Sequence, residues 1–126
     1  MSREAWGDEG PEYGPLDAAM EAGWLDPTDL SKALLDVMNE RDRQWNEENF
    51  DPAHDDKYGK GVLAAAGACY ALYSDAYPNA GQPPKEWPWA AGWWKPKDYR
   101  RDLVRAAALL IAEIERIDRA EKAAKP

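Results

Sequence analysis

Tryptophans and basic residues gather in one stretch of the chain, from Trp87 to Asp102. Four of the seven tryptophans and four of the sixteen lysines and arginines lie there, in a protein of formal net charge −8. A helical pattern begins directly afterwards. Because a helix N-terminus carries partial positive charge, it normally attracts Asp or Glu, so cations at this point are unusual. An anion bound here would be held by backbone N–H groups and by cations together.

Aromatic rings beside cations are typical of nucleotide recognition. A ring that stacks on a base contributes about 1–3 kcal/mol, and arginines meet phosphates. Arg101 and Arg105 are one helical turn apart, so they lie on one face and can clamp one anion. The stretch therefore predicts a site for a nucleotide-derived anion, with contacts from Trp93, Trp94, Lys95, Lys97, Arg100, Arg101 and Arg105.

A structural explanation of the same residues stays open. The tryptophans would then close one end of a helical bundle. The arginines would pair with acidic residues of the chain, such as Asp55, Asp56 and Asp98. With 24 acidic residues available, such pairing needs no ligand.

A second cluster surrounds the single histidine, in the sequence His54-Asp55-Asp56. With Glu48 it would offer hard oxygen ligands suited to Mg²⁺ or Mn²⁺, and a metal site of Glu48, His54, Asp55 and Asp56 in a Mg-dependent nucleotide pyrophosphohydrolase is an alternative. Adjacent residues on a helix point about 100° apart, so these side chains converge only if the segment is irregular. The other interpretation has the acids serving as helix caps and ion-pair partners. The leading hypothesis requires neither a metal nor another cofactor.

Composition limits the class of protein. We expect a chain of 126 residues to form one domain, and its hydrophobic residues are rich in Ala and Trp, which favours helix over sheet. The acidic balance argues against duplex nucleic-acid binding, because phosphate neutralisation dominates that affinity. It also permits a protein-binding inhibitor with an acidic surface. No apolar run is long enough for a membrane span, and the lone Cys69 lies in an apolar run, so we expect a cytosolic protein.

The predicted fold is all-α, a small bundle of three main helices with a long Trp/Pro-rich loop before the last one. We expect an N-terminal arm with a short helical turn over 1–26, a helical domain over 27–121 and a frayed tail over 122–126. The first main helix is expected at about 27–46, with Leu34 and Trp45 on its apolar face.

The second main helix is expected to begin at the Asp51-Pro52 step, because Asp before Pro is a helix start signal. From Val62 to Tyr73 its sequence has no polar face except the tyrosine hydroxyls. We therefore expect it to be the buried central helix of the bundle.

The last helix, predicted from residue 98 to about 121, carries a heptad-like apolar seam. Its members alternate four and three residues apart, and they are Leu103, Ala107, Leu110, Ile114 and Ile117. Such a seam packs on neighbouring helices or pairs with a second copy of the chain. We therefore expect a homo-oligomer formed through this helix.

About two thirds of the chain, from Arg41 to Ala120, resembles a group of small phage and prophage proteins, most of which have no assigned activity. The shared pattern has these elements: Arg43-Gln44, Pro52-Ala-His54-Asp55-Asp56, Gly61 with the Ala-rich helix, Trp87-Pro-Trp89, Trp94-Lys95-Pro96-Lys97, Arg100-Arg101-Asp102-Leu103, and Ala112-Glu113-Ile114-Glu115-Arg116. Glu48-Asn49-Phe50 stands where the group usually has Glu-Gly-Trp.

The resemblance implies a phage-encoded accessory protein that acts in the host cytosol, and small phage proteins of this kind often counter host defence. Together with the aromatic and basic stretch, it leads to our hypothesis of an anti-defence protein that binds and sequesters a nucleotide-derived signal without turnover. The alternatives are the Mg-dependent pyrophosphohydrolase and an acidic inhibitor that binds a host defence protein.

Overall fold

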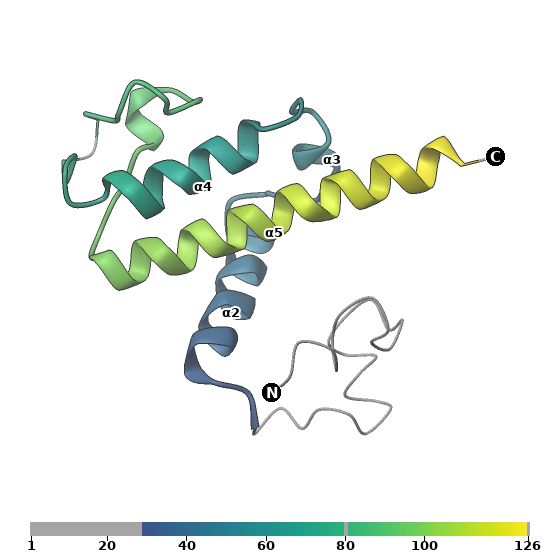
Figure 1. The fold of residues 1–126 in the computed structure, drawn as a ribbon, viewed down its shortest axis with the longest axis horizontal. Coiled ribbons are helices and arrows are strands. Elements are labelled where there is room, and N and C mark those ends of the chain that lie inside the picture. Colours follow the sequence, from purple (N-terminus) through teal and green to yellow (C-terminus); the bar gives the residue numbers. More distant parts are fainter. Residues whose placement is uncertain (1–28, 80, 126) are drawn as a thin grey trace. The chain divides into compact units, whose positions relative to one another are not determined.

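The computed structural model describes residues 29–79 and 81–125, and the chain divides into two units, residues 1–32 and 33–126. The predicted arm over 1–26 lies outside the described residues. The described elements are α2 Lys32–Glu47, α3 Pro52–Asp55, α4 Val62–Tyr73, the 3₁₀ helix η3 Ala91–Trp93, and α5 Tyr99–Ala124 (Figure 1). The described part of the chain is thus all-α, with three main helices and a long loop before the last one, as predicted. None of these helices is both long and apolar enough to cross a membrane.

The core lies between α4 and α5, which run side by side in opposite directions (Figure 1). Apolar side chains of both helices are buried there, among them Leu63, Cys69 and Leu109. At Gly67 an added Cβ would lie 3.0 Å from the carbonyl oxygen of Ala106, so glycine lets the two backbones approach this closely. The prediction of a buried central helix is confirmed for one face of α4, whereas Leu72 on the other face is 70% exposed.

The helix boundaries differ from those predicted. α2 begins at Lys32, after residues 29–31, and not near residue 27. The helix expected from the Asp51-Pro52 step is broken in two, because α3 ends after one turn and α4 starts only after Gly61, whose φ of 89° is left-handed. The last helix continues to Ala124, three residues beyond the expected end.

α2 turns a polar face inward, which the sequence did not predict. Leu34 and Trp45, which were predicted for its apolar face, are exposed, whereas Glu40, Arg41 and Gln44 are buried. The reason lies in contacts distant in the sequence. Charged side chains connect α2 to the rest of its unit through the pairs Asp36–Arg100, Glu40–Arg101, Arg41–Asp55 and Arg41–Glu115.

The segment between α4 and α5 is anchored by two of its tryptophans. Trp87 and Trp94 are buried, and each indole N–H donates to a backbone carbonyl, at 3.1 Å for Ala90 and 2.8 Å for Tyr77. The Trp94 ring also stacks on Tyr70 of α4, with the ring centroids 4.8 Å apart. These contacts fix the segment against the core and so position the side chains between its anchors.

Candidate ligand-binding site

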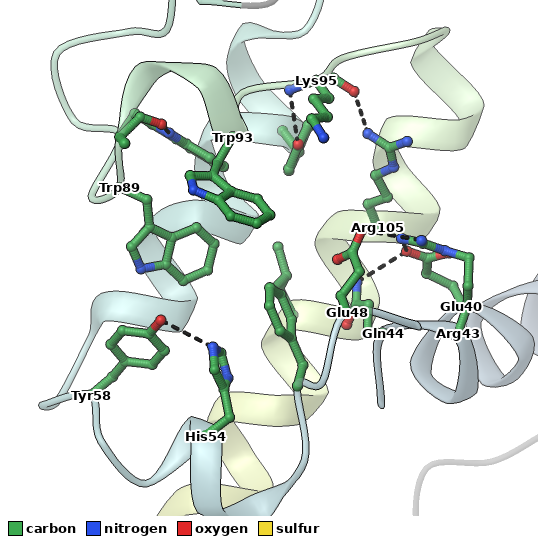
Figure 2. A pocket seen from close by; sticks show the side chains of 15 residues that line it. Glu40, Arg43, Gln44, Glu48, His54, Tyr58, Trp89, Trp93, Lys95 and Arg105 are labelled. Carbon is green, nitrogen blue, oxygen red and sulfur yellow. Dashed lines mark hydrogen bonds and ion pairs between the residues drawn. The ribbon is translucent and has the colours of Figure 1, made fainter. Parts of the chain in front are cut away.

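A cavity of about 440 Å³ lies within the second unit, between α2, α5 and the tryptophan-rich segment (Figure 2). Its volume falls within the range of about 300–1,000 Å³ that is typical of small-molecule pockets. Its aromatic lining residues are Phe50, Tyr58, Tyr70, Trp87, Trp89 and Trp93. Its charged and polar lining residues are Glu40, Arg43, Gln44, Glu48, His54, Lys95 and Arg105.

The aromatic wall is built from rings that pack against one another. Trp89 lies edge-on to Trp87, with centroids 5.4 Å apart, and tilted against Tyr58 at 5.5 Å. Phe50 stacks on His54 at 4.4 Å with an interplanar angle of 6°. Such mutual packing orients the rings of Phe50, Tyr58, Trp87 and Trp89, which makes this part of the wall a preformed stacking surface.

The polar wall is organised by the buried carboxylate of Glu40. It accepts two hydrogen bonds from Arg43, both of 2.8 Å, and a further one from Arg101. Burial acts to raise the pKa of Glu40, but the hydrogen bonds and charges of the two arginines outweigh it and lower that pKa below its ordinary value. Glu40 is therefore an ionised, acceptor-only group at neutral pH.

Glu40 in turn fixes the side-chain amide of Gln44. The Gln44 Nε2 donates to Glu40 Oε2 at 3.1 Å. A carboxylate only accepts, so the amide nitrogen must face it and the amide oxygen must point elsewhere. The Gln44 Oε1 atom is buried and has no hydrogen-bond partner.

Two further buried polar atoms share this property, the indole Nε1 of Trp89 and the guanidinium Nε of Arg105. All three unpartnered side-chain atoms found among residues 29–79 and 81–125 belong to residues that line the cavity. Buried polar groups are nearly always hydrogen-bonded, and leaving one unsatisfied costs about 1–3 kcal/mol. The residues that line the cavity therefore carry one acceptor atom and two donor atoms without a partner among the described residues.

The cavity also has two cations that no carboxylate neutralises within the described ranges. The Nζ of Lys95 lies 5.4 Å from the Trp93 ring centroid, and the Cζ of Arg105 lies 5.5 Å from that of Tyr70. Arg105 also donates to the backbone carbonyl of Lys95. The acids of the cavity, Glu40 and Glu48, are paired with Arg43, so Lys95 and Arg105 give the site its local positive charge.

The seven predicted contact residues are distributed over different environments. Trp93, Lys95 and Arg105 line the cavity, as the ligand hypothesis requires. Trp94 is a core residue, because its side chain is fully buried. Lys97 is exposed, and Arg100 and Arg101 form ion pairs with Asp36 and Glu40.

The predicted anion position at the start of the last helix is filled by the chain itself. The side chain of Asp98 caps α5 by accepting from the Arg101 N–H at 2.8 Å. The buried carboxylate of Asp102 accepts from the Lys97 N–H at 3.0 Å and from the Ser74 hydroxyl. These two negative charges compensate the partial positive charge at the N-terminus of α5. The unfavourable interaction expected between that end of the helix and the nearby basic residues is thereby offset.

The residues of the metal alternative form ion pairs and hydrogen bonds with other groups. Glu48 pairs with Arg43, Asp55 with Arg41, and Asp56 with Arg119. Asp55 and Asp56 are therefore not the partners of Arg100 and Arg101. His54 Nδ1 lies 3.0 Å from Asp55 Oδ1, and its Nε2 lies 3.1 Å from the Tyr58 hydroxyl. In the described part of the chain, no three or more His, Cys, Asp or Glu side chains form a group that could hold a metal ion.

Sequence reasoning missed Gln44 and Trp89 as site residues. The structure brings Arg43, Gln44, His54, Trp87, Trp89 and Lys95 to the cavity from three separate parts of the chain. Trp89 lies in the tryptophan-rich stretch that the sequence singled out, whereas no sequence signal indicated Gln44. Comparisons of the chain with models of protein families, with curated proteins and with solved structures find no match. The functional argument therefore depends on the cavity itself.

Proposed function

We propose that this protein binds a nucleotide-derived anionic small molecule in the cavity and sequesters it without chemical turnover. One observation carries the proposal: the same cavity is lined by an aromatic wall, by two cations without carboxylate partners and by all three described residues that have an unpartnered buried side-chain atom. A planar, hydrogen-bonding and negatively charged ligand matches all three features. We further propose that the protein is a phage-encoded accessory protein and that it removes a host defence signal by binding it.

The base would stack on the aromatic wall. Figure 2 shows the rings of Trp89 and Trp93 on one side of the cavity, across from Arg43, Gln44 and Arg105. A flat ring between these sides would contact indole faces and present its edge to polar groups. Nucleobase edges carry both donors and acceptors, which suits a set of one acceptor and two donors.

The anionic group would lie near Lys95 and Arg105. These two side chains are adjacent, because Arg105 donates to the Lys95 carbonyl. Arginine recognises phosphate through several N–H groups at once, and Lys95 adds a point charge. The ring-stacked position of both cations holds them at the cavity before a ligand arrives.

Sequestration without turnover is supported by the state of the polar lining. The two ring nitrogens of His54 are already engaged by Asp55 and Tyr58. Burial raises the pKa of the Tyr58 hydroxyl, and the charge of Asp55 adds to this, so the phenol stays protonated near neutral pH. Glu40 and Glu48 are bound to Arg43. The carboxylates of the lining are thus paired with arginine, whereas His54 stands in an Asp–His–Tyr chain, so recovery of the intact ligand is the measurement that separates sequestration from hydrolysis.

The test is calorimetric titration of the full chain, without added metal, with cyclic dinucleotides, ADP-ribose and mononucleotides. At least one compound should bind with a stoichiometry of one per chain. Denaturing the complex by heat should then return the compound intact. Hydrolysed product would contradict sequestration, and no binding to any member of the panel would contradict the proposed ligand class.

A matched pair of variants connects binding to the cavity. Trp89→Ala should weaken binding by about 5- to 140-fold, which is 1–3 kcal/mol of lost stacking. Trp45→Ala removes an exposed tryptophan that does not line the cavity and should leave affinity unchanged. Equal effects of the two substitutions would place the ligand elsewhere.

A further inference from the structure

α5 carries an apolar row that is only partly covered by the described chain, with Leu110 at its edge lying near Gly67 of α4. Leu103, Leu110, Ile114 and Ile117 are 38%, 43%, 56% and 38% exposed, and Ala107 between them is partly exposed. Single exposed apolar side chains are ordinary, but a continuous row of them marks an interaction surface. We call this row, with its members at alternating four- and three-residue spacing, the α5 seam.

The α5 seam faces away from the cavity. Successive residues of a helix are rotated by about 100°, so Leu103 and Arg105 lie about 200° apart around α5. Arg105 lines the cavity. Leu109, one turn further along the same side of α5, packs against α4. A partner that covers the seam would therefore leave the ligand site accessible.

A charged residue continues the seam at each end, and the two charges have opposite signs. Arg100 precedes Leu103 by three residues, and Glu121 follows Ile117 by four, so both keep the spacing. Both side chains are exposed. Asp36 binds Arg100 through Nη1 alone, which is one of several guanidinium nitrogens available for further contacts.

We propose that two copies of the chain associate through the α5 seam in antiparallel orientation, crossing at Leu110. This pairing is independent of the proposed ligand. It brings Arg100 of each copy next to Glu121 of the other at both ends, whereas parallel pairing would place like charges together. It also sets the small Ala107 opposite the large Ile114, which lets the two helices approach closely. The symmetry is two-fold, and each surface is its own complement.

The first test measures mass by sedimentation equilibrium. The full chain should be a dimer, and Leu110→Glu with Ile114→Glu should raise the dimer dissociation constant at least 100-fold while the circular dichroism spectrum keeps its helical form. Leu72→Glu changes a largely exposed leucine of α4 outside the seam and should leave the mass unchanged. A native chain that is monomeric up to about 1 mM would overturn the proposal, since that is the weak limit of specific association. An equal effect of Leu72→Glu would also overturn it.

The second test addresses orientation by charge reversal. Glu121→Arg should weaken the dimer by about 2- to 30-fold, because it replaces two exposed ion pairs with like charges. Adding Arg100→Glu to the same chain should restore the affinity, since the opposite charges meet again. Failure of the double variant to recover would refute the antiparallel arrangement, as parallel helices would still oppose like charges.

Discussion

Replacing Glu40 by glutamine tests whether the polar inward face of α2 holds that helix in place. The carboxylate is 2% exposed and accepts hydrogen bonds from Arg43, Arg101 and Gln44. Glutamine has nearly the same shape but no charge, and its amide NH₂ cannot accept a hydrogen bond. The substitution therefore leaves two buried or half-buried guanidinium groups facing a neutral side chain.

The expected loss is large for a domain of this size. Removing one partner of a buried ion pair costs about 3–5 kcal/mol, and the remaining amide oxygen recovers part of this. We expect Glu40→Gln to lower the free energy of unfolding by about 3 kcal/mol. At about 4–8 °C per kcal/mol, the midpoint of thermal unfolding should fall by about 12–24 °C.

Glu47→Gln is the matched control, because Glu47 lies on the same helix and pairs with the same Arg43. That ion pair is 3.6 Å long and its carboxylate is 68% exposed. Exposed pairs of this kind contribute about 0.3–0.5 kcal/mol. Urea unfolding followed by tryptophan fluorescence measures both variants. If Glu40→Gln costs less than about 1 kcal/mol, or no more than Glu47→Gln, the network does not hold α2.

The pH dependence gives a second readout of the same group. The pKa of Glu40 is lowered from 4.5 in the folded state, so its stabilisation is complete above the unfolded-state pKa and is lost as the pH falls through the folded-state value. Glutamine does not titrate. The stability difference between native chain and variant should be constant from pH 6 to 8 and should narrow below about pH 4.3. A difference that grew on acidification would contradict this assignment.

Three further substitutions test the packing, the helix start and the site. Gly67→Ala should lower the free energy of unfolding in urea by about 1–3 kcal/mol, because the added Cβ would meet the Ala106 carbonyl oxygen at 3.0 Å. Gly92→Ala is the control, because an added Cβ there meets no atom within 4 Å and should cause no steric destabilisation. Asp98→Ala should cost about 1 kcal/mol by removing the cap of α5, measured by thermal unfolding, and no loss would contradict the capping role. Arg105→Lys keeps the charge but removes the unpartnered Nε, so nucleotide affinity in calorimetry should fall about fivefold, for one hydrogen bond of about 1 kcal/mol. Unchanged affinity would exclude that Nε from the site.

The sequence was sufficient to predict which segments are helical but not which face of α2 is buried. Local periodicity located the stripe that contains Leu34 and Trp45. Whether such a stripe faces inward depends on its tertiary partners, and those of Glu40 include Arg101, which is 61 residues away. By contrast, the part of α4 from Val62 to Tyr73 was correctly predicted to contribute to the core, because its sequence is apolar all round, although its start at the Asp51-Pro52 step was wrong.

The candidate site was predictable only in part, for a similar reason. Trp93 and Trp94 are neighbours, yet the first lines the cavity and is exposed, and the second is fully buried. They lie at the end of a short 3₁₀ helix, where no long periodicity indicates the direction of each side chain. The composition of the stretch predicted a functional region, while the roles of Gln44 and Trp89 depend on contacts that only the fold creates.

The inward face of α2 is difficult to explain by stability alone. A buried ion pair seldom stabilises a fold more than well-packed apolar residues of the same size would. A more stable α2 would bury its apolar stripe, but this helix exposes Leu34 and Trp45 and buries Glu40 and Gln44. The two buried residues form one polar wall of the cavity. In this wall the ionised Glu40 carboxylate accepts a hydrogen bond from the Gln44 amide nitrogen, and the Gln44 amide oxygen has no partner. Departures from local rules of this kind are expected at functional sites, and a ligand that donates a hydrogen bond to Gln44 would supply the missing interaction.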